Sequence, residues 1–125
     1  MSYLTILVLV FSIITAGIGQ IALKKGALVF SDLKFSSSAI FDMVFGLFQN
    51  KWLLVGTLLF IISFFSYIFV LSKIQLNFAY PVMVSLGIIL VAVGSQIFLG
   101  EQLSLRNIVG IVLIIFGILL LIPKI

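Results

Sequence analysis

Apolar runs long enough to cross a membrane take up most of this chain and decide which folds are open to it. A transmembrane helix needs about 20 mainly apolar residues, and four stretches of the 125-residue sequence meet or approach that length. The predicted spans are 3–23, 52–72, 78–99 and 105–122. They leave no room for a separate soluble domain, so we predict a single four-helix transmembrane domain over residues 1–125.

The composition agrees with a membrane protein built from helices. Hydrophobic residues make up 64% of the chain and charged residues only 8%, whereas charged residues make up about a quarter of a typical soluble domain. Strands of a membrane barrel alternate apolar and polar residues, but these runs are apolar on every side. We therefore predict an all-α, multi-pass membrane protein.

Several classes of function have no residues to support them. The chain has no cysteine and no histidine, so thiolate ligands and the commonest metal ligand are absent, and we expect no metal and no cofactor. The acids Asp32, Asp42 and Glu101 lie outside the predicted spans, and no nucleophile has a base beside it. We expect no enzyme activity. The net charge of +4 is spread over helix ends, which does not favour nucleic-acid binding.

The first connection is long and contains an amphipathic pattern of its own. Residues 38–49 place Phe41 and Phe45 on one helical face and Asp42 on another. Because this segment is too short to span, we predict a helix lying in the membrane interface, with a hydrophobic loop packed on the bundle as the alternative. The later connections are short, so the second, third and fourth spans are predicted to be sequential antiparallel neighbours. Ser104 is a candidate N-cap for the fourth.

Basic residues are unevenly divided between the two ends of the predicted spans. One end carries Lys24, Lys25, Lys34, Lys51 and Arg106, and the other carries Lys73 and Lys124. By the positive-inside rule, the first connection lies in the cytoplasm and both termini lie outside. This bias shrinks towards balance if Lys24 or Lys25 is buried and functional, so the orientation stays open.

A polar stripe runs along the first span. Residues 12, 16, 20 and 24 are spaced four apart, which places Gln20 and Lys24 on one helical face. Polar side chains inside a span are costly and tend to face a bundle interior or a wet cavity, so both are candidate substrate-binding residues. The alternatives are an interhelical hydrogen bond for Gln20 and, for Lys24, a side chain that reaches the headgroups.

The later spans add three further candidates and a glycine pattern. Tyr67 in the second span, and Tyr80 and Ser85 in the third, are candidate substrate-binding residues. Gly110 and Gly117 are seven apart in the fourth span, a spacing that keeps both on one face where another backbone can approach. Because four short helices enclose little volume, we predict a dimer that forms through this face.

Taken in order, these motifs resemble those of four-helix members of the drug/metabolite transporter superfamily. A glutamine precedes a lysine in the first span, AYP opens the third, and GE precedes the fourth. The segment GIVLIIFGI, residues 110–118, is similar to the dimerisation motif of the small multidrug resistance family, whose fold is an antiparallel dimer of four-helix subunits. The resemblance implies a homodimer, or a heterodimer with a related small subunit, in the cell inner membrane.

Two positions depart from that family's pattern. Ala16 stands where the family carries its drug- and proton-binding glutamate, and Met83 stands where it carries a tryptophan. Without a carboxylate that exchanges protons for a cation, drug export by the family's mechanism is disfavoured.

The chain has a closer likeness to the small subunits of 4-amino-4-deoxy-L-arabinose phosphoundecaprenol flippases. GQIALKKGA, residues 19–27, resembles their first helix, and AYPVMVSL, residues 79–86, resembles the entry to their third. This likeness implies a polyprenyl-phosphate-linked sugar lipid as the cargo. The chemistry agrees, because Lys24 near the membrane interface, with Gln20 and Tyr80 as hydrogen-bond partners, suits a phosphate. The alternatives are an exporter of cationic drugs or metabolites and a non-transporting assembly subunit.

Overall fold

Five α-helices and one short 3-10 helix make up the part of the chain, residues 1–122, that the computed structural model describes. They are α1 (Tyr3–Ala27), η1 (Leu28–Phe30), α2 (Ser37–Gln49), α3 (Lys51–Leu71), α4 (Leu76–Leu99) and α5 (Leu105–Leu121). The predicted all-α fold class is confirmed. α1, α3 and α4 are long and apolar enough to cross a membrane, whereas α2 and α5 are shorter apolar helices.

Side-chain caps explain where several helices begin. The Ser36 hydroxyl accepts a hydrogen bond from the backbone of Ala39 at the start of α2, and Asn50 Oδ1 accepts one from Trp52 at the start of α3. Ser104 accepts one from Asn107 and caps α5, which confirms its predicted role. Such caps satisfy N–H groups that the first turn of a helix leaves without partners.

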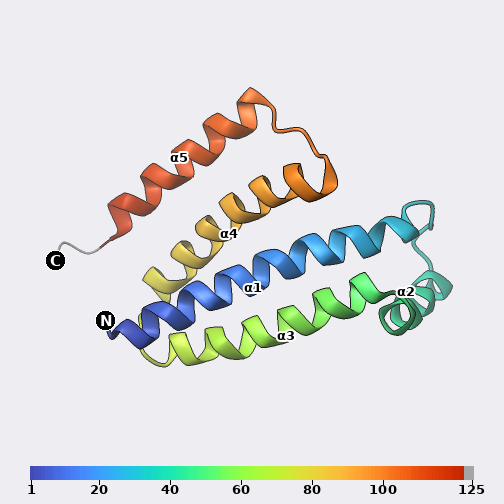
Figure 1. Cartoon of the computed structure of the whole chain (residues 1–125), viewed down its shortest axis with the longest axis horizontal. Coiled ribbons are helices and arrows are strands. Elements are labelled where there is room, and N and C mark those ends of the chain that lie inside the picture. The colour runs from blue at the N-terminus through green and yellow to red at the C-terminus, as the bar shows by residue number, and fades with distance from the viewer. Residues whose placement is uncertain (123–125) are drawn as a thin grey trace.

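Helix α1 is the centre of the molecule, with α3 on one side and α4 on the other (Figure 1). The expectation that the second, third and fourth spans pack as sequential neighbours is therefore wrong for α3 and α4, which make few contacts with each other. The short loop brings their ends together, but α1 fills the space between them. Chain connectivity thus does not decide the packing order here.

Backbones approach closely where α1 crosses α3. A Cβ on Gly56 would lie 2.9 Å from the carbonyl oxygen of Gly19, and a Cβ on Gly26 would lie 2.8 Å from the backbone nitrogen of Leu53. Near the middle of both helices, the Ser12 hydroxyl donates to the Ser63 carbonyl at 3.0 Å, and the Ser63 hydroxyl donates to the Ser12 carbonyl at 2.8 Å. Small residues and interhelical hydrogen bonds thus stabilise this pair, as is common in membranes.

Contacts between α1 and α4 depend on larger side chains. Leu90 of α4 covers Gly17 of α1, and Ile21 of α1 covers Gly94 of α4. Where α1, α3 and α4 meet, near the start of α1, a small apolar cluster forms around Leu9, Ile13, Val70 and Ala79. The three long helices are therefore held together at that end by side-chain packing.

Helix α5 is the least supported element. Its main contacts are with α4, and none of its described residues is buried. A Cβ added to Gly110 or Gly117 would meet nothing within 4 Å. The glycine face predicted to form a dimer is thus open within this chain.

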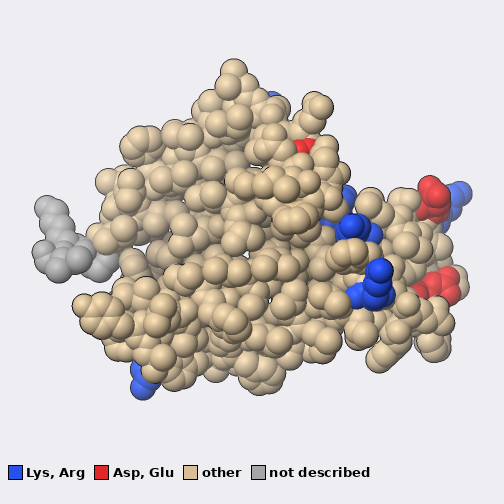
Figure 2. All heavy atoms as spheres, viewed as in Figure 1, with Lys and Arg blue, Asp and Glu red and all other residues tan. Residues whose placement is uncertain are grey.

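Helix α2 lies at the end of the molecule where α1 ends and α3 begins, and Figure 1 shows it nearly end-on where the long helices run across the view. Its Ala39 is buried, and Phe30 covers Gly46, but Phe41, Phe45 and Phe48 are exposed. Most basic side chains gather at this end of the molecule, where α1 ends and α3 begins (Figure 2). Lys73 follows the opposite end of α3, and Lys124 lies outside the described residues.

Candidate functional site

An open groove of about 720 Å³ lies between α1, α3 and α4. Its walls are mainly apolar, with a few polar side chains. The lining residues are Ala16, Gly17, Gln20, Phe60, Tyr67, Tyr80, Met83, Val84, Gly87, Ile88, Val91 and Ala92. An apolar concavity with a small number of polar groups is typical of a ligand site.

The groove exists because α1 separates α3 from α4. α1 contributes Ala16 and Gln20, which are one turn apart, and α3 contributes Phe60 and Tyr67. α4 forms the remaining wall, where the absence of a side chain at Gly87 leaves open space. The groove therefore follows directly from the packing order of the helices.

Gln20 faces this groove with its side chain exposed. Within residues 1–122, its amide makes no hydrogen bond to another side chain or to the backbone of a neighbouring helix. The interhelical bond that was the alternative reading is instead made by Ser12, two turns earlier on the same stripe. The amide of Gln20 is free to donate and accept hydrogen bonds inside the groove.

Two tyrosines enter the same groove from different helices. Tyr67 comes from α3 and Tyr80 from α4, and Tyr80 is 58% exposed. The Tyr67 hydroxyl is buried without a hydrogen-bond partner, the one such side-chain atom in the described part of the chain. Leaving a buried polar group unpaired costs about 1–3 kcal/mol, so this hydroxyl is a strong candidate for bonding to a ligand.

Ser85 does not line the groove. It is buried, and its hydroxyl donates to the carbonyl oxygen of Pro81 at 2.7 Å, one turn earlier in α4. A serine hydroxyl that bonds to the carbonyl four residues earlier is a local arrangement within one helix. The structure therefore gives Ser85 a local backbone partner and separates it from Gln20, Tyr67 and Tyr80.

Lys24 lies one helical turn beyond Gln20, about 6 Å further along α1, and outside the residues that line the groove. Its ammonium is 3.8 Å from the carboxylate of Glu101, and both side chains are about half exposed. Glu101 reaches this position because Gly100 ends α4 in a left-handed conformation with φ 69°. An exposed pair of this kind contributes about 0–1 kcal/mol, so a stronger anion competes easily for Lys24.

Three of the residues that line the groove were not predicted as substrate-binding residues. Ala16 and Met83 stood out in the sequence only as departures from a family pattern, and both line the groove. Phe60 had no signal, because phenylalanines occur on several sides of the second span. In the described part of the chain, no group of three acidic, histidine or cysteine residues could hold a metal. The polar groups of the groove offer hydrogen bonds, and the charge lies beside it on Lys24.

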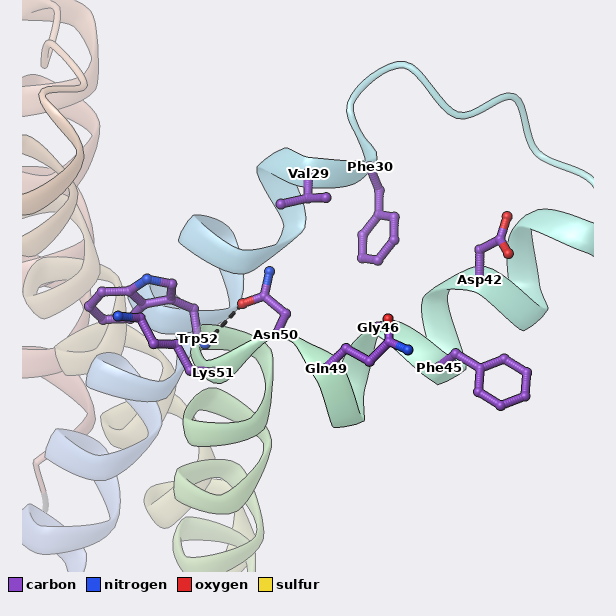
Figure 3. A pocket seen from close by; sticks show the side chains of 9 residues that line it. All are labelled: Val29, Phe30, Asp42, Phe45, Gly46, Gln49, Asn50, Lys51 and Trp52. Carbon is purple, nitrogen blue, oxygen red and sulfur yellow. Dashed lines mark hydrogen bonds between the residues drawn. The ribbon is translucent and has the colours of Figure 1, made fainter.

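A second cavity, of about 710 Å³, lies at the junction of η1, α2 and α3 (Figure 3). Lys51 and Trp52 lie on one side of it, and Asp42 and Phe45 lie on the other. The Lys25 ammonium lies 4.2 Å from the centre of the Trp52 ring. This cavity is separate from the groove and shares no lining residue with it.

This fold and site define a class of protein, a small helical membrane protein with an open groove between its long helices. Residues 37–114, more than half of the chain, match the family described as Small Multidrug Resistance protein, and the chain belongs to that family. The match begins at α2 and leaves out α1. Family membership and the three long apolar helices confirm the predicted location, the cell inner membrane.

The curated proteins that resemble this chain share one description. The chain is 37% identical over 73 residues, 58% of its length and 63% of the relative's, to the probable 4-amino-4-deoxy-L-arabinose-phosphoundecaprenol flippase subunit ArnE of Aeromonas hydrophila. The protein with the same description from Yersinia pseudotuberculosis is 35% identical over 71 residues, which cover 57% of this chain and 61% of the relative. The one from Aeromonas salmonicida is 37% identical over 72 residues, which cover 58% of this chain and 62% of the relative. The match spans less than two thirds of each relative. No solved structure matches the chain.

Proposed function

We propose that this chain is a membrane translocase, or a subunit of one, that moves an anionic polyprenyl-phosphate-linked sugar across the bilayer. The observation that carries the proposal is the open groove that holds Gln20, Tyr67 and Tyr80, with Lys24 one turn beyond it. The names of the curated relatives support the same cargo class.

The groove suits the two halves of such a lipid. Apolar walls from Phe60, Met83 and Val84 offer a surface for a polyprenyl chain. The Tyr67 hydroxyl and the Gln20 amide offer hydrogen bonds to the sugar. A lysine ammonium is a compact charge that suits a phosphate, and Ala16 places no competing carboxylate in the groove.

In the membrane, we propose that α1, α3, α4 and α5 each cross the bilayer and that α2 lies in the interface, as one transmembrane domain. Helix α5 has 17 residues, a length of about 25 Å, at the lower limit for a crossing helix. The position of α2 at one end of the bundle, at an angle to the long helices and with exposed phenylalanines, supports an interfacial placement.

The active unit, we propose, is a dimer formed through α5, either with a second copy or with a related small subunit. The open glycine face at Gly110 and Gly117 supports this arrangement, because nothing within the described chain covers it. The relatives are named as subunits, which favours a paired assembly.

Reconstituted liposomes test the function directly. Movement of a fluorescent polyprenyl-phosphate sugar between leaflets should occur with the wild type and should be lost in Lys24→Ala. Lys73→Ala removes a lysine from the opposite end of α3 and should transport normally. Transport retained in Lys24→Ala would remove Lys24 from the mechanism, and no transport by any assembled form would exclude the translocase.

Family membership favours a second candidate, an exporter of cationic drugs or metabolites. Its test is proton-coupled uptake of a cationic dye into vesicles, which we expect to be absent because α1 carries Ala16 and no acid within the groove. Clear proton exchange would favour the exporter over the lipid translocase. Copurification with a stoichiometric partner and an inert purified chain would favour an assembly subunit.

A further inference from the structure

Two lysines converge on the single tryptophan of the chain. The ammonium of Lys25, in the last turn of α1, lies 4.2 Å from the centre of the Trp52 ring. The ammonium of Lys51, the first residue of α3, lies 5.7 Å from the same centre. Each contact is a cation–π interaction, which attracts a cation to the ring face. The ring therefore gathers two positive charges at the junction of α1 and α3.

No acid offsets these two charges in the described part of the chain. The one ion pair of residues 1–122 joins Lys24 to Glu101 and leaves Lys25 and Lys51 without a carboxylate partner. Asp42 lines the same cavity as Lys51, but it lies on the far side, on α2 (Figure 3). Two positive charges near one ring without a carboxylate to offset them favour an anion at this junction.

The surroundings supply what the rest of a lipid needs. The cavity beside Lys51 and Trp52 has a volume of about 710 Å³, and Val29, Phe30 and Phe45 give it apolar walls. The neighbouring Phe41 and Phe48 of α2 are exposed. A free phosphate would gain nothing from these apolar groups, whereas a phospholipid would bury acyl carbons against them.

From this arrangement we propose that Lys25, Lys51 and Trp52 form a binding site for the phosphate headgroup of an anionic bilayer phospholipid, with its upper acyl chain against η1 and α2. The site is independent of the proposed transport groove, because the two cavities share no residue. It would hold the end of the bundle at a fixed depth in the membrane. The lipid is bound as a structural partner and is not transported.

Trp52 reports on its own site, since it is the only tryptophan in the sequence. The intact protein is reconstituted in phosphatidylcholine bilayers that contain a small share of brominated phosphatidylglycerol or, separately, of brominated phosphatidylcholine. Bromine quenches tryptophan fluorescence on contact, so the two quenching curves give the preference for the anionic lipid. We expect phosphatidylglycerol to quench more strongly at equal mole fraction.

Variants assign the preference to the two lysines. Lys25→Gln and Lys51→Gln should each lower it about fivefold, the effect of one lysine near an anionic surface, and the double variant should abolish it. Lys25→Arg and Lys51→Arg keep the charge and should keep the preference. Lys73→Gln, at the other end of α3, should keep the wild-type preference for the anionic lipid.

Three outcomes would overturn the proposal. Equal quenching by the two lipids in the wild type would show that no anionic preference exists, and this comparison needs no variant to fold. A preference that survives in a folded double variant would place the site elsewhere. Loss of the preference on adding inorganic phosphate at matched ionic strength would show that the occupant is a free anion.

Discussion

At the scale of single residues, the positive charge of Lys24 beside the groove is paired with the carboxylate of Glu101. Lys24 holds Glu101 at 3.8 Å in a half-exposed pair, and that pair contributes at most about 1 kcal/mol. Glu101 comes from the chain segment after α4, so it competes with any anion for the same ammonium. The carboxylate is thus a built-in competitor of the proposed substrate.

Removing that competitor should strengthen anion binding. In Glu101→Gln, we expect a short-chain polyprenyl phosphate to bind up to about fivefold more tightly, since the exposed pair is worth at most about 1 kcal/mol. Isothermal titration of the detergent-solubilised protein measures the change, with Asp42→Asn as a control that removes an acid away from Lys24. Unchanged or weaker binding in Glu101→Gln would contradict a phosphate site at Lys24.

The unpaired hydroxyl of Tyr67 predicts opposite effects on stability and transport. Tyr67→Phe removes a buried group that has no partner, so the free energy of unfolding should stay equal or rise by about 1–3 kcal/mol. Lipid movement in liposomes should fall, because the substrate loses a hydrogen bond. Tyr3→Phe changes an exposed tyrosine outside the groove and should alter neither. A Tyr67→Phe variant that loses stability and keeps transport would assign the hydroxyl a structural role.

At the scale of helices, small residues spaced seven apart along the sequence favour the pairing of α1 with α3. Residues Thr5, Ser12, Gly19 and Gly26 of α1 are spaced seven apart, and all four are buried. Gly56, Ser63 and Val70 follow the same spacing on α3 and are also buried. Matching stripes of small residues on two helices favour close packing.

The remaining elements were predictable to different degrees. The lengths of the apolar runs and the capping serines predicted the helices, because both are local properties of the chain. The order α3, α1, α4 was not predicted, because short loops constrain helix ends and not the faces between them. Gln20, Tyr67 and Tyr80 were brought together by that same order, whereas Ser85 found a partner inside its own helix.

Close backbone contact makes the α1–α3 pair sensitive to added volume. In Gly56→Ala, the new methyl group would lie 2.9 Å from the Gly19 carbonyl oxygen, so we expect a loss of about 1–3 kcal/mol in the free energy of unfolding. Denaturation by sodium dodecyl sulfate, followed by circular dichroism, measures it. Gly87→Ala adds a methyl group into open space and should leave stability unchanged. Equal stability of both variants would contradict the tight crossing.

At the scale of the whole molecule, two surfaces of the described chain have no protein partner. Helix α5 has no buried residue in the described chain, and the groove is open along one side. A second subunit packed against α5 would cover the open glycine face at Gly110 and Gly117. The curated relatives are named as subunits, which fits the paired assembly proposed above.

Bulky residues on the glycine face should separate the subunits. Gly110→Leu and Gly117→Leu should lower the dimer fraction in mild detergent, because each side chain fills the space where a neighbouring backbone approaches. Analytical ultracentrifugation measures the change. Val112→Leu adds volume on the opposite face of α5 and should leave the dimer intact. Dimers that persist in both glycine variants would place the interface on another helix.

The contrast between the two sides of α1 determines how this molecule deforms. On the α3 side, backbones touch and hydroxyl groups bond across the interface, so sliding or tilting would break contacts that no rotamer change restores. On the α4 side, leucine and isoleucine side chains fill the interface and can change rotamer. The bundle is therefore stiff along one wall of the groove and compliant along the other. Widening the groove costs least when α4 moves and carries α5 with it.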